Sequence, residues 1–287
     1  MTEPKIPQGG LEGMSALVTG GGSGIGLGCA ARLARDGAHV TICGRSEDKL
    51  RAAAGEIEAA AAAGATVTTV ACDVTDEDQV SVAVAKAAER TGRLEMVIAS
   101  AGGTEWMGPI NQAPLDAWRR VLALNIDGTF LTLKHSTRLM VKQGGGSFVG
   151  ISSIAGGSTH RWFGAYGVGK AGIEATCLLA ADELGASGVR VNVVRPGLVR
   201  TALTTLLTEG GPVTEDYLAQ MPVSRVGTVD DVAGLCRYLV GPESTWMTGQ
   251  VIGIDGGHSL RRGPDFTAYM EPTWGADALR GVVKEEE

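Results

Sequence analysis

The chain has 287 residues, of which 44% are hydrophobic and 20% charged, and its formal net charge is −7. An acidic chain without clustered Lys and Arg argues against a nucleic-acid partner, because neutralised phosphates supply most of the affinity of such complexes. No apolar run approaches the about 18 residues of a membrane span, and Met1–Lys5 does not resemble a signal peptide. We therefore expect a cytoplasmic protein with no membrane span.

Short apolar runs alternate with helical patterns along the chain. The expected strands are Ser15–Thr19, His39–Cys43, Val67–Ala71, Met96–Ala99, Ser147–Ile151, Arg190–Val194 and Gln250–Ile254. The expected helices are Gly24–Asp36, Glu47–Ala63, Asp76–Arg90, Leu115–Met140, Tyr166–Ser187 and Val229–Val240. Strands that are apolar throughout indicate a parallel sheet with helices on both faces. The pattern predicts a single doubly wound, Rossmann-like α/β domain with a seven-stranded parallel sheet, spanning residues 1–262.

A glycine-rich turn, Thr19–Gly26, separates the first expected strand from the first helix. Glycines let the backbone turn sharply and approach a pyrophosphate at the positive end of the helix. The spacing is not the GxGxxG of the general dinucleotide fingerprint. Taken alone, the turn predicts either a phosphate site or a tight strand–helix corner.

The order of motifs resembles the short-chain dehydrogenase/reductase family over nearly the whole chain. The matching pieces are TGxxxGIG at Thr19–Gly26, Asp73 in CDVT, Asn125 in ALNIDGTF, Ser153 in ISSIAG, Tyr166 and Lys170 in YGVGK, Pro196–Thr201 as PGLVRT, and Asp255–Gly257. The serine precedes the tyrosine by the interval usual in the family. One piece departs, because Ala99–Gly102 reads ASAG where the family commonly has NNAG.

The resemblance implies a catalytic set and a cofactor site. It makes Tyr166 the acid/base, Lys170 the residue that binds the nicotinamide ribose and tunes the tyrosine, Ser153 the holder of the substrate oxygen, and Asn125 part of a water-mediated proton relay. A nearby ammonium is expected to lower the pKa of Tyr166. No metal is required. The implied cofactor-binding residues are Gly20, Gly22, Ser23, Gly24, Ile25, Gly26, Arg45, Ser46, Asp73, Val74, Ala101, Gly102, Tyr166, Lys170, Pro196, Gly197, Val199 and Thr201.

The end of the second strand indicates which nicotinamide cofactor is preferred. An NAD enzyme of this architecture places an acidic residue there to bind the ribose hydroxyls. This chain has Gly44 at that point, followed by Arg45 and Ser46, which suit a 2′-phosphate. We expect NADP(H) to be preferred, with NAD(H) possible.

The substrate side is expected to be apolar. Candidate flanking residues are Trp106, Met107, Trp162, Phe163, Leu203, Leu206, Leu207, Tyr217 and Met221; His160 is either a substrate contact or a surface residue. Residues 201–222 correspond to the variable substrate lid of the family, and residues 263–287 form a C-terminal surface extension with a mobile end.

Three functions remain open at this stage. The first is hydride transfer between NADP(H) and a carbonyl or alcohol carbon of an apolar or acyl-thioester-like substrate. The second is an enoyl-thioester reductase, and the third is a non-catalytic NADP-binding regulator. The family also implies a homo-oligomer, a tetramer or dimer, formed through Leu115–Met140 and Tyr166–Ser187.

Overall fold

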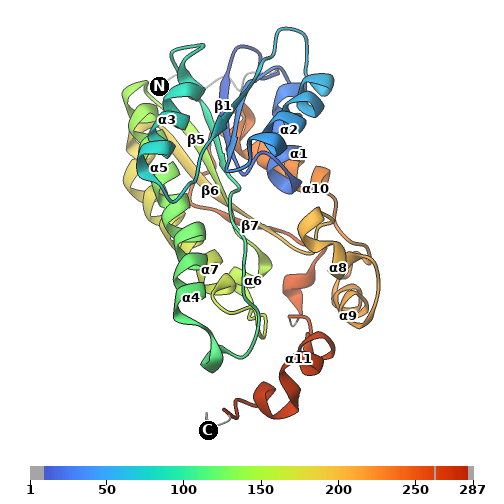
Figure 1. Ribbon diagram of the computed structural model, residues 1–287. Coiled ribbons are helices and arrows are strands. Elements are labelled where there is room, and N and C mark those ends of the chain that lie inside the picture. The colour runs from blue at the N-terminus through green and yellow to red at the C-terminus, as the bar shows by residue number, and fades with distance from the viewer. Residues whose placement is uncertain (1–9, 262, 284–287) are drawn as a thin grey trace.

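A twisted seven-stranded sheet forms the centre of the molecule (Figure 1). The computed structural model describes residues 10–261 and 263–283. The strand order is β3-β2-β1-β4-β5-β6-β7, and each pair is parallel, which confirms the predicted sheet. The strands are β1 Ser15–Thr19, β2 His39–Gly44, β3 Val67–Ala71, β4 Met96–Ala99, β5 Gly146–Ile151, β6 Val189–Pro196 and β7 Val251–Ile254.

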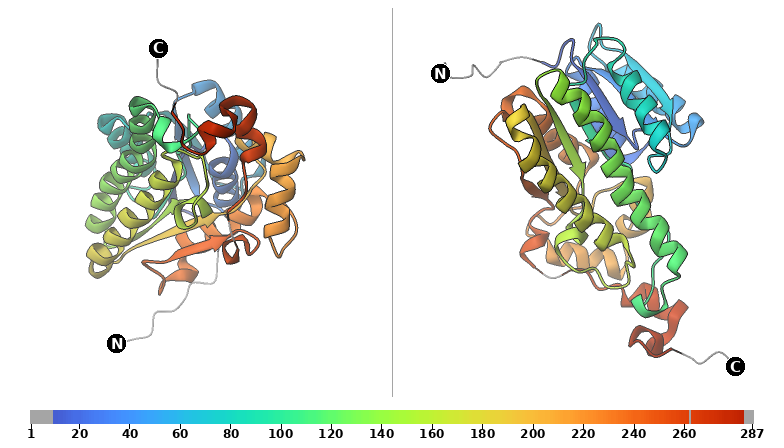
Figure 2. Two further views of the ribbon diagram at one scale, coloured as in Figure 1. Left: turned by 90° about the horizontal axis from the view of Figure 1, so that it is seen from below. Right: turned by 90° about the vertical axis from the view of Figure 1, so that its left-hand side faces the viewer.

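Helices cover both faces of this sheet (Figure 2). Helices α1 (Gly24–Arg35), α2 (Glu47–Ala60) and α10 (Val229–Val240) cover one face. Helices α3 (Glu77–Ala88), α5 (Gly128–Lys142) and α7 (Tyr166–Leu184) cover the other. None of the helices in the described part of the chain is long and apolar enough to cross a membrane.

The central strands are largely apolar because each of their two faces lies in a separate core. In β1, Ala16 and Val18 join the core under α1 and α10, whereas Leu17 between them joins the core under α3, α5 and α7. Successive side chains of a strand point to opposite faces, so a sheet covered on both sides removes the usual polar alternation.

The expected helix over Leu115–Met140 is interrupted around Asn125. It consists of α4 (Leu115–Leu122), a π-helical turn at Ala123–Asp127, and α5. Asn125 lies in the wider turn, and its Nδ2 donates to the carbonyl oxygen of Val121, at 2.8 Å. Single π-helical turns are frequent at functional sites because they displace side chains from the regular helical register.

Four short helices lie outside the sequence prediction: α6 (Ile154–Gly157), α8 (Thr205–Thr208), α9 (Pro212–Gln220) and α11 (Thr267–Leu279). Helix α11 belongs to the segment 263–287, which was expected to form a surface extension and for which no helix was predicted. Pro272 lies inside it and Gly275 has a φ of 76°, so a kink hides its periodicity. The expectations for Met1–Lys5 and for the mobile end at residues 284–287 concern positions outside the described residues.

Candidate functional site

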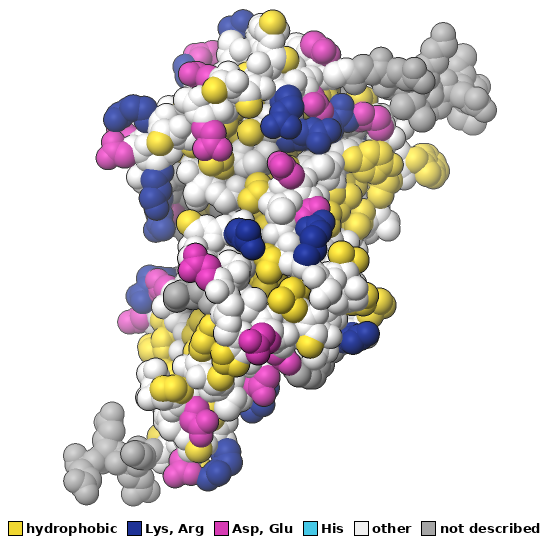
Figure 3. All heavy atoms as spheres, turned by 90° about the vertical axis from the view of Figure 1, so that its right-hand side faces the viewer, with side chains coloured by type: hydrophobic (Ala, Val, Ile, Leu, Met, Phe, Trp, Pro, Cys, Tyr) yellow, Lys and Arg dark blue, Asp and Glu magenta, His cyan; other side chains and the backbone are white. Residues whose placement is uncertain are grey.

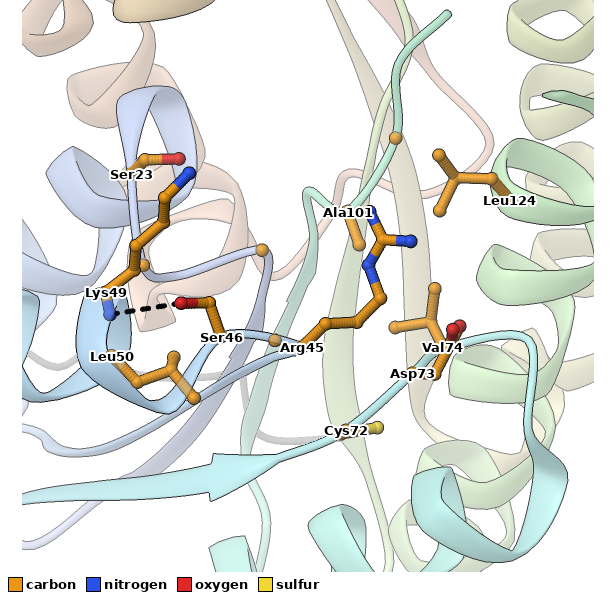
Figure 4. Close-up of a pocket in the computed structure, with 14 residues that line it drawn as sticks. Ser23, Arg45, Ser46, Lys49, Leu50, Cys72, Asp73, Val74, Ala101 and Leu124 are labelled. Atoms are coloured by element: carbon orange, nitrogen blue, oxygen red, sulfur yellow. Dashed lines mark hydrogen bonds between the residues drawn. The ribbon is translucent and has the colours of Figure 1, made fainter. Parts of the chain in front are cut away.

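A pocket of about 230 Å³ lies at the carboxyl ends of β1, β2, β3 and β4 (Figure 4). This is where the strand order reverses, between β1 and β4, which is the usual ligand site of a doubly wound sheet. Its lining residues are Gly20, Gly22, Ser23, Gly44, Arg45, Ser46, Lys49, Leu50, Cys72, Asp73, Val74, Ala101, Gly102 and Leu124. Nine of the residues expected to bind cofactor therefore come together here.

The glycine turn leaves no room for side chains. A Cβ on Gly20 would lie 2.9 Å from the backbone nitrogen of Ala101, and Gly20 has a φ of 67°. A Cβ on Gly26 would lie 2.4 Å from the carbonyl oxygen of Gly20. The bare backbone thus borders the pocket at the start of α1, an arrangement that fits the pyrophosphate of a dinucleotide.

Two cations lie at the β2 side of this pocket. Figure 4 shows the Arg45 side chain extending across the pocket towards Ala101, and Lys49 reaching from α2 towards Ser23. Ser46 caps α2 by accepting the Lys49 backbone N–H. Sequence reasoning missed Lys49, although it follows Arg45 by four residues, in the first turn of the expected helix.

The Asp73 carboxylate lines the pocket opposite these cations. It accepts hydrogen bonds from the Thr75 backbone N–H at 3.0 Å and the Thr75 hydroxyl at 2.8 Å. These bonds, with a smaller contribution from Arg45, hold the pKa of Asp73 below its ordinary value. A rigid, ionised Asp73 can accept hydrogen bonds from a bound ligand.

The predicted catalytic residues converge beside the pocket. The Ser153 hydroxyl lies beside the Tyr166 phenol and favours its ionised form, and the Lys170 Nζ lies 5.6 Å from the centre of the Tyr166 ring. Lys170 Nζ also donates to the carbonyl oxygen of Ile151, at 2.9 Å. Ser153 follows β5 by two residues and is the N-cap of the short helix α6, whereas α7 carries both Tyr166 and Lys170, so two helices set the geometry.

At Tyr166, burial outweighs the lowering of the pKa that was expected from Lys170. Burial raises the pKa of Tyr166, and the Ser153 hydrogen bond opposes that shift without cancelling it. Burial also lowers the pKa of Lys170 to about 8, so its ammonium is less favoured than in water but is still the main form at pH 7. The physical reason is the low polarity around both groups, which penalises either charged form.

Gly102 links the catalytic residues to the cofactor pocket. A Cβ on Gly102 would lie 2.7 Å from Asn125 Oδ1 and 2.9 Å from Lys170 Nζ. Asn125 is fully buried, its Oδ1 accepts from the Gly103 backbone N–H, and its Nδ2 donates to the Gly103 carbonyl. The glycine of the unusual ASAG motif is therefore required for Asn125 and Lys170 to approach the pocket.

A buried ionic network supports the catalytic turn from behind. Glu174 on α7 accepts from the Ser152 hydroxyl at 2.6 Å and from Arg195 Nε at 2.9 Å. A second Arg195 nitrogen pairs with the other Glu174 oxygen. These contacts tie β6 and α7 to the residue that precedes Ser153, and so hold the serine in place.

A second, apolar cavity of about 570 Å³ opens on the other side of Ser153 and Tyr166. Of the expected substrate-flanking residues, Met107, Phe163, Leu203, Leu207 and Tyr217 line it, as does His160. Trp162 and Met221 are instead buried in the adjoining core, and Trp106 packs on Trp274. The side chain of Leu206 is not among those that the structure describes. The cavity is also lined by Thr104, Ser153, Ile154, Ala155, Tyr166, Gly197, Leu198, Thr204, Phe266, Tyr269 and Met270.

The C-terminal segment supplies three of these lining residues, which sequence reasoning did not identify. Phe266, Tyr269 and Met270 reach the cavity from just before and within α11. No periodicity or spacing signal links them to the catalytic motifs.

The remaining residues that were expected to bind the cofactor lie around the polar pocket and the apolar cavity. Gly24, Ile25 and Gly26 form the first turn of α1, and Pro196 ends β6. Gly197 lines the apolar cavity, and Val199 forms a bridge with Gly227. Thr201 begins the lid and approaches the glycine turn, since a Cβ on Gly24 would lie 3.4 Å from its Cγ2.

Comparison with known proteins identifies the family of the chain. A family model described as Enoyl-(acyl carrier protein) reductase matches residues 20–259. The 3-oxoacyl-[acyl-carrier-protein] reductase FabG of Thermotoga maritima is 34% identical over 247 residues, covering 86% of this chain and 98% of that protein.

Solved structures agree with this match. A short-chain type dehydrogenase/reductase from Mycobacterium ulcerans is 52% identical with a TM-score of 0.93, covering 95% of this chain and 99% of that one. A 7α-hydroxysteroid dehydrogenase complexed with NADH and 7-oxo glycochenodeoxycholic acid is 28% identical with a TM-score of 0.80, covering 86% and 94%. The chain belongs to the short-chain dehydrogenase/reductase family of oxidoreductases, which bind nicotinamide cofactors.

Proposed function

We propose that this protein is an NADP(H)-dependent oxidoreductase that interconverts a ketone and a secondary alcohol on an apolar or acyl-thioester-like substrate. The observation that carries the proposal is the position of Ser153 and Tyr166 as a neighbouring pair. It lines the apolar cavity, while Lys170 behind it borders Gly102 of the polar pocket. A substrate carbonyl and a dinucleotide can thus meet at these three residues.

The chain's own residues account for the proton chemistry. A bound nicotinamide supplies or accepts the hydride. Tyr166 donates the proton to the developing alkoxide or removes it from the alcohol, and Ser153 holds the same oxygen. Lys170 binds the ribose hydroxyls, and Asn125 orders a water between itself and Lys170. The glycine turn and Thr201 hold the phosphates, and Asp73, Val74 and Ala101 border the adenosine.

A panel of carbonyl substrates tests the proposal directly. NADPH absorbance is followed with apolar ketones, β-ketoacyl thioesters and enoyl thioesters. We expect oxidation of NADPH with ketones or β-ketoacyl thioesters. Turnover confined to enoyl thioesters would support the second candidate, which the description of the matching family model favours. Cofactor binding with no turnover would support a regulator.

The lid, residues 201–222, is proposed to order over bound ligands. Gly210 and Gly211 both have positive φ and separate α8 from α9, while Leu203 is 74% exposed beside the cavity. We expect hydrogen exchange in residues 202–211 to be fast in the free protein and slower with NADPH. Exchange that is equally slow in both states would contradict the lid.

Exposed apolar side chains support a homo-oligomer built through the α4–α5 and α7 helices. Phe130 on α5 is 46% exposed, and Leu179 on α7 is 61% exposed. We expect Phe130→Glu with Leu179→Glu to reduce the sedimentation coefficient of a dimer or tetramer, because charge is poorly tolerated in an apolar interface. Val82→Glu, on the exposed face of α3, is the matched control. A wild-type monomer would refute the proposal.

The distribution of surface charge agrees with a small-molecule substrate. On the face in Figure 3, cationic and anionic side chains are interspersed, and no continuous basic stripe crosses it. The net charge of −7 points the same way. We propose a cytoplasmic enzyme without a nucleic-acid partner.

A further inference from the structure

Tyr217 on α9 is a buried phenol that the proposed reaction does not use. It is 4% exposed and lines the apolar cavity. No described residue forms a hydrogen bond with its hydroxyl, and the hydroxyl is not among the fully enclosed polar atoms without a partner, so it is accessible from the cavity. A buried tyrosine hydroxyl normally has a hydrogen-bond partner, because an unsatisfied one costs free energy. A ligand bound in the cavity could therefore supply the hydrogen-bond partner of this hydroxyl.

Aromatic packing fixes the position of the Tyr217 ring. Phe266, which is fully buried, meets it edge-on with ring centres 6.1 Å apart and planes at 88°. His258 meets it at 5.3 Å and 83°. The ring is thus held between the C-terminal segment and the end of the sheet, so its hydroxyl is preorganised without a hydrogen bond.

Tyr217 and the catalytic Tyr166 face the same space. Both residues line the cavity. Burial raises the pKa of Tyr217, and the Tyr166 phenol adds to this shift, so the two hydroxyls lie within electrostatic range of each other. Phe163 joins the two sides, with its ring centre 5.9 Å from that of Tyr166 and 4.7 Å from that of Phe266.

The cavity favours a neutral ligand. Its described lining contains no Lys or Arg. His160 is the basic residue in the lining, and burial lowers its pKa below the ordinary 6.5, so it is neutral at pH 7. A carboxylate bound here would lose its hydration without gaining a cation.

We propose that Tyr217 is a specificity-determining residue that hydrogen-bonds a second, neutral oxygen of the substrate. This oxygen is a hydroxyl or carbonyl on the same apolar body as the carbonyl that reacts at Tyr166 and Ser153. The inference rests on the proposed function and narrows its substrate class to bifunctional, uncharged compounds. A substrate held at both oxygens presents its reacting carbon in one orientation.

Matched pairs of ketones test the role of Tyr217. The kcat/KM for NADPH-dependent reduction is measured for 2-, 3- and 4-hydroxycyclohexanone and for the methylcyclohexanones of the same positions. We expect wild type to prefer the hydroxyl member of at least one pair by about tenfold, the value of one hydrogen bond. In Tyr217→Phe that preference should disappear, while the methyl ketones change by about twofold or less. 4-Oxocyclohexanecarboxylate should be a poor substrate of both enzymes.

The controls separate this inference from the proposed function. Tyr238→Phe removes a hydroxyl from α10, away from the cavity, and should keep the wild-type preference. If Tyr217→Phe keeps the preference for the hydroxyl ketone, or if wild type shows no such preference, the role of Tyr217 is overturned. Reduction of the methyl ketones would then still support the proposed function. If no ketone is reduced, the proposed function fails, and calorimetry of 4-hydroxycyclohexanol and 4-methylcyclohexanol with the NADPH complex decides the inference. Equal affinities there would overturn it.

Discussion

Replacement of Tyr166 by Phe is expected to reduce kcat/KM for ketone reduction by about 10²–10⁴-fold. The variant loses the hydroxyl that is proposed to supply the proton, but it keeps the ring near which the Lys170 Nζ lies, 5.6 Å from its centre. Steady-state kinetics with NADPH and any accepted ketone measures the loss. Fluorescence titration of NADPH should give a Kd close to that of wild type, because the cofactor pocket lies beside the phenol and is not lined by it.

The control for this substitution is Tyr238→Phe, since Tyr238 is 40% exposed on α10. It should retain full turnover. If Tyr166→Phe also turned over at a rate near that of wild type, another group would have to supply the proton, and the assignment of Tyr166 would be wrong.

Replacement of Arg45 by Ala is expected to remove most of a preference for NADPH over NADH of about ten- to hundredfold. Hydrogen bonds to charged groups contribute about 1.5–3 kcal/mol, and each 1.4 kcal/mol is a factor of ten in affinity. The guanidinium crosses a pocket bordered by Gly44, so a 2′-phosphate meets a cation and no acidic side chain from the end of β2. Affinity for NADH should change little. Separate titrations of both cofactors measure the two effects.

Arg51→Ala is the matched control for Arg45. Arg51 lies on α2, which begins two residues after Arg45; it is exposed and pairs with Asp48 outside the pocket. Its loss should leave both affinities unchanged. Lys49→Ala should produce a smaller loss than Arg45→Ala, because an ammonium makes no paired hydrogen bonds to phosphate. Tighter binding of NADH than NADPH by the wild-type protein would refute the cofactor proposal.

The parts of the fold that could be predicted from the sequence are those with a local signal. The run around Leu17 is apolar because both faces of β1 are buried. Such a run predicts a buried strand from the sequence alone. Tyr166 and Lys170 could be paired because four residues of helix place them on one face. Gly20 and Gly26 could be identified from the glycine-rich turn. The structure shows why glycine is needed there, because a Cβ on either residue would meet backbone atoms.

The parts that could not be predicted depend on contacts between distant segments. Phe266 meets Tyr217 across 49 positions of the chain, and no spacing rule links them. The π-helical turn at Asn125 has no residue pattern that distinguishes it from a regular helix. The Lys170 pKa of about 8 depends on burial by the surrounding elements, whereas the sequence shows only its nearness to Tyr166.

The most direct test of the proposed reaction is the destination of the hydride. The enzyme is supplied with NADPH deuterated at both C4 positions and with the best ketone or β-ketoacyl thioester, and the product is analysed by NMR and mass spectrometry. The proposal predicts one deuterium per molecule, bound to the carbinol carbon. Deuterium found only on the β carbon of a saturated acyl thioester formed from an enoyl substrate, with none on the carbinol carbon of any alcohol formed from a ketone, would contradict it.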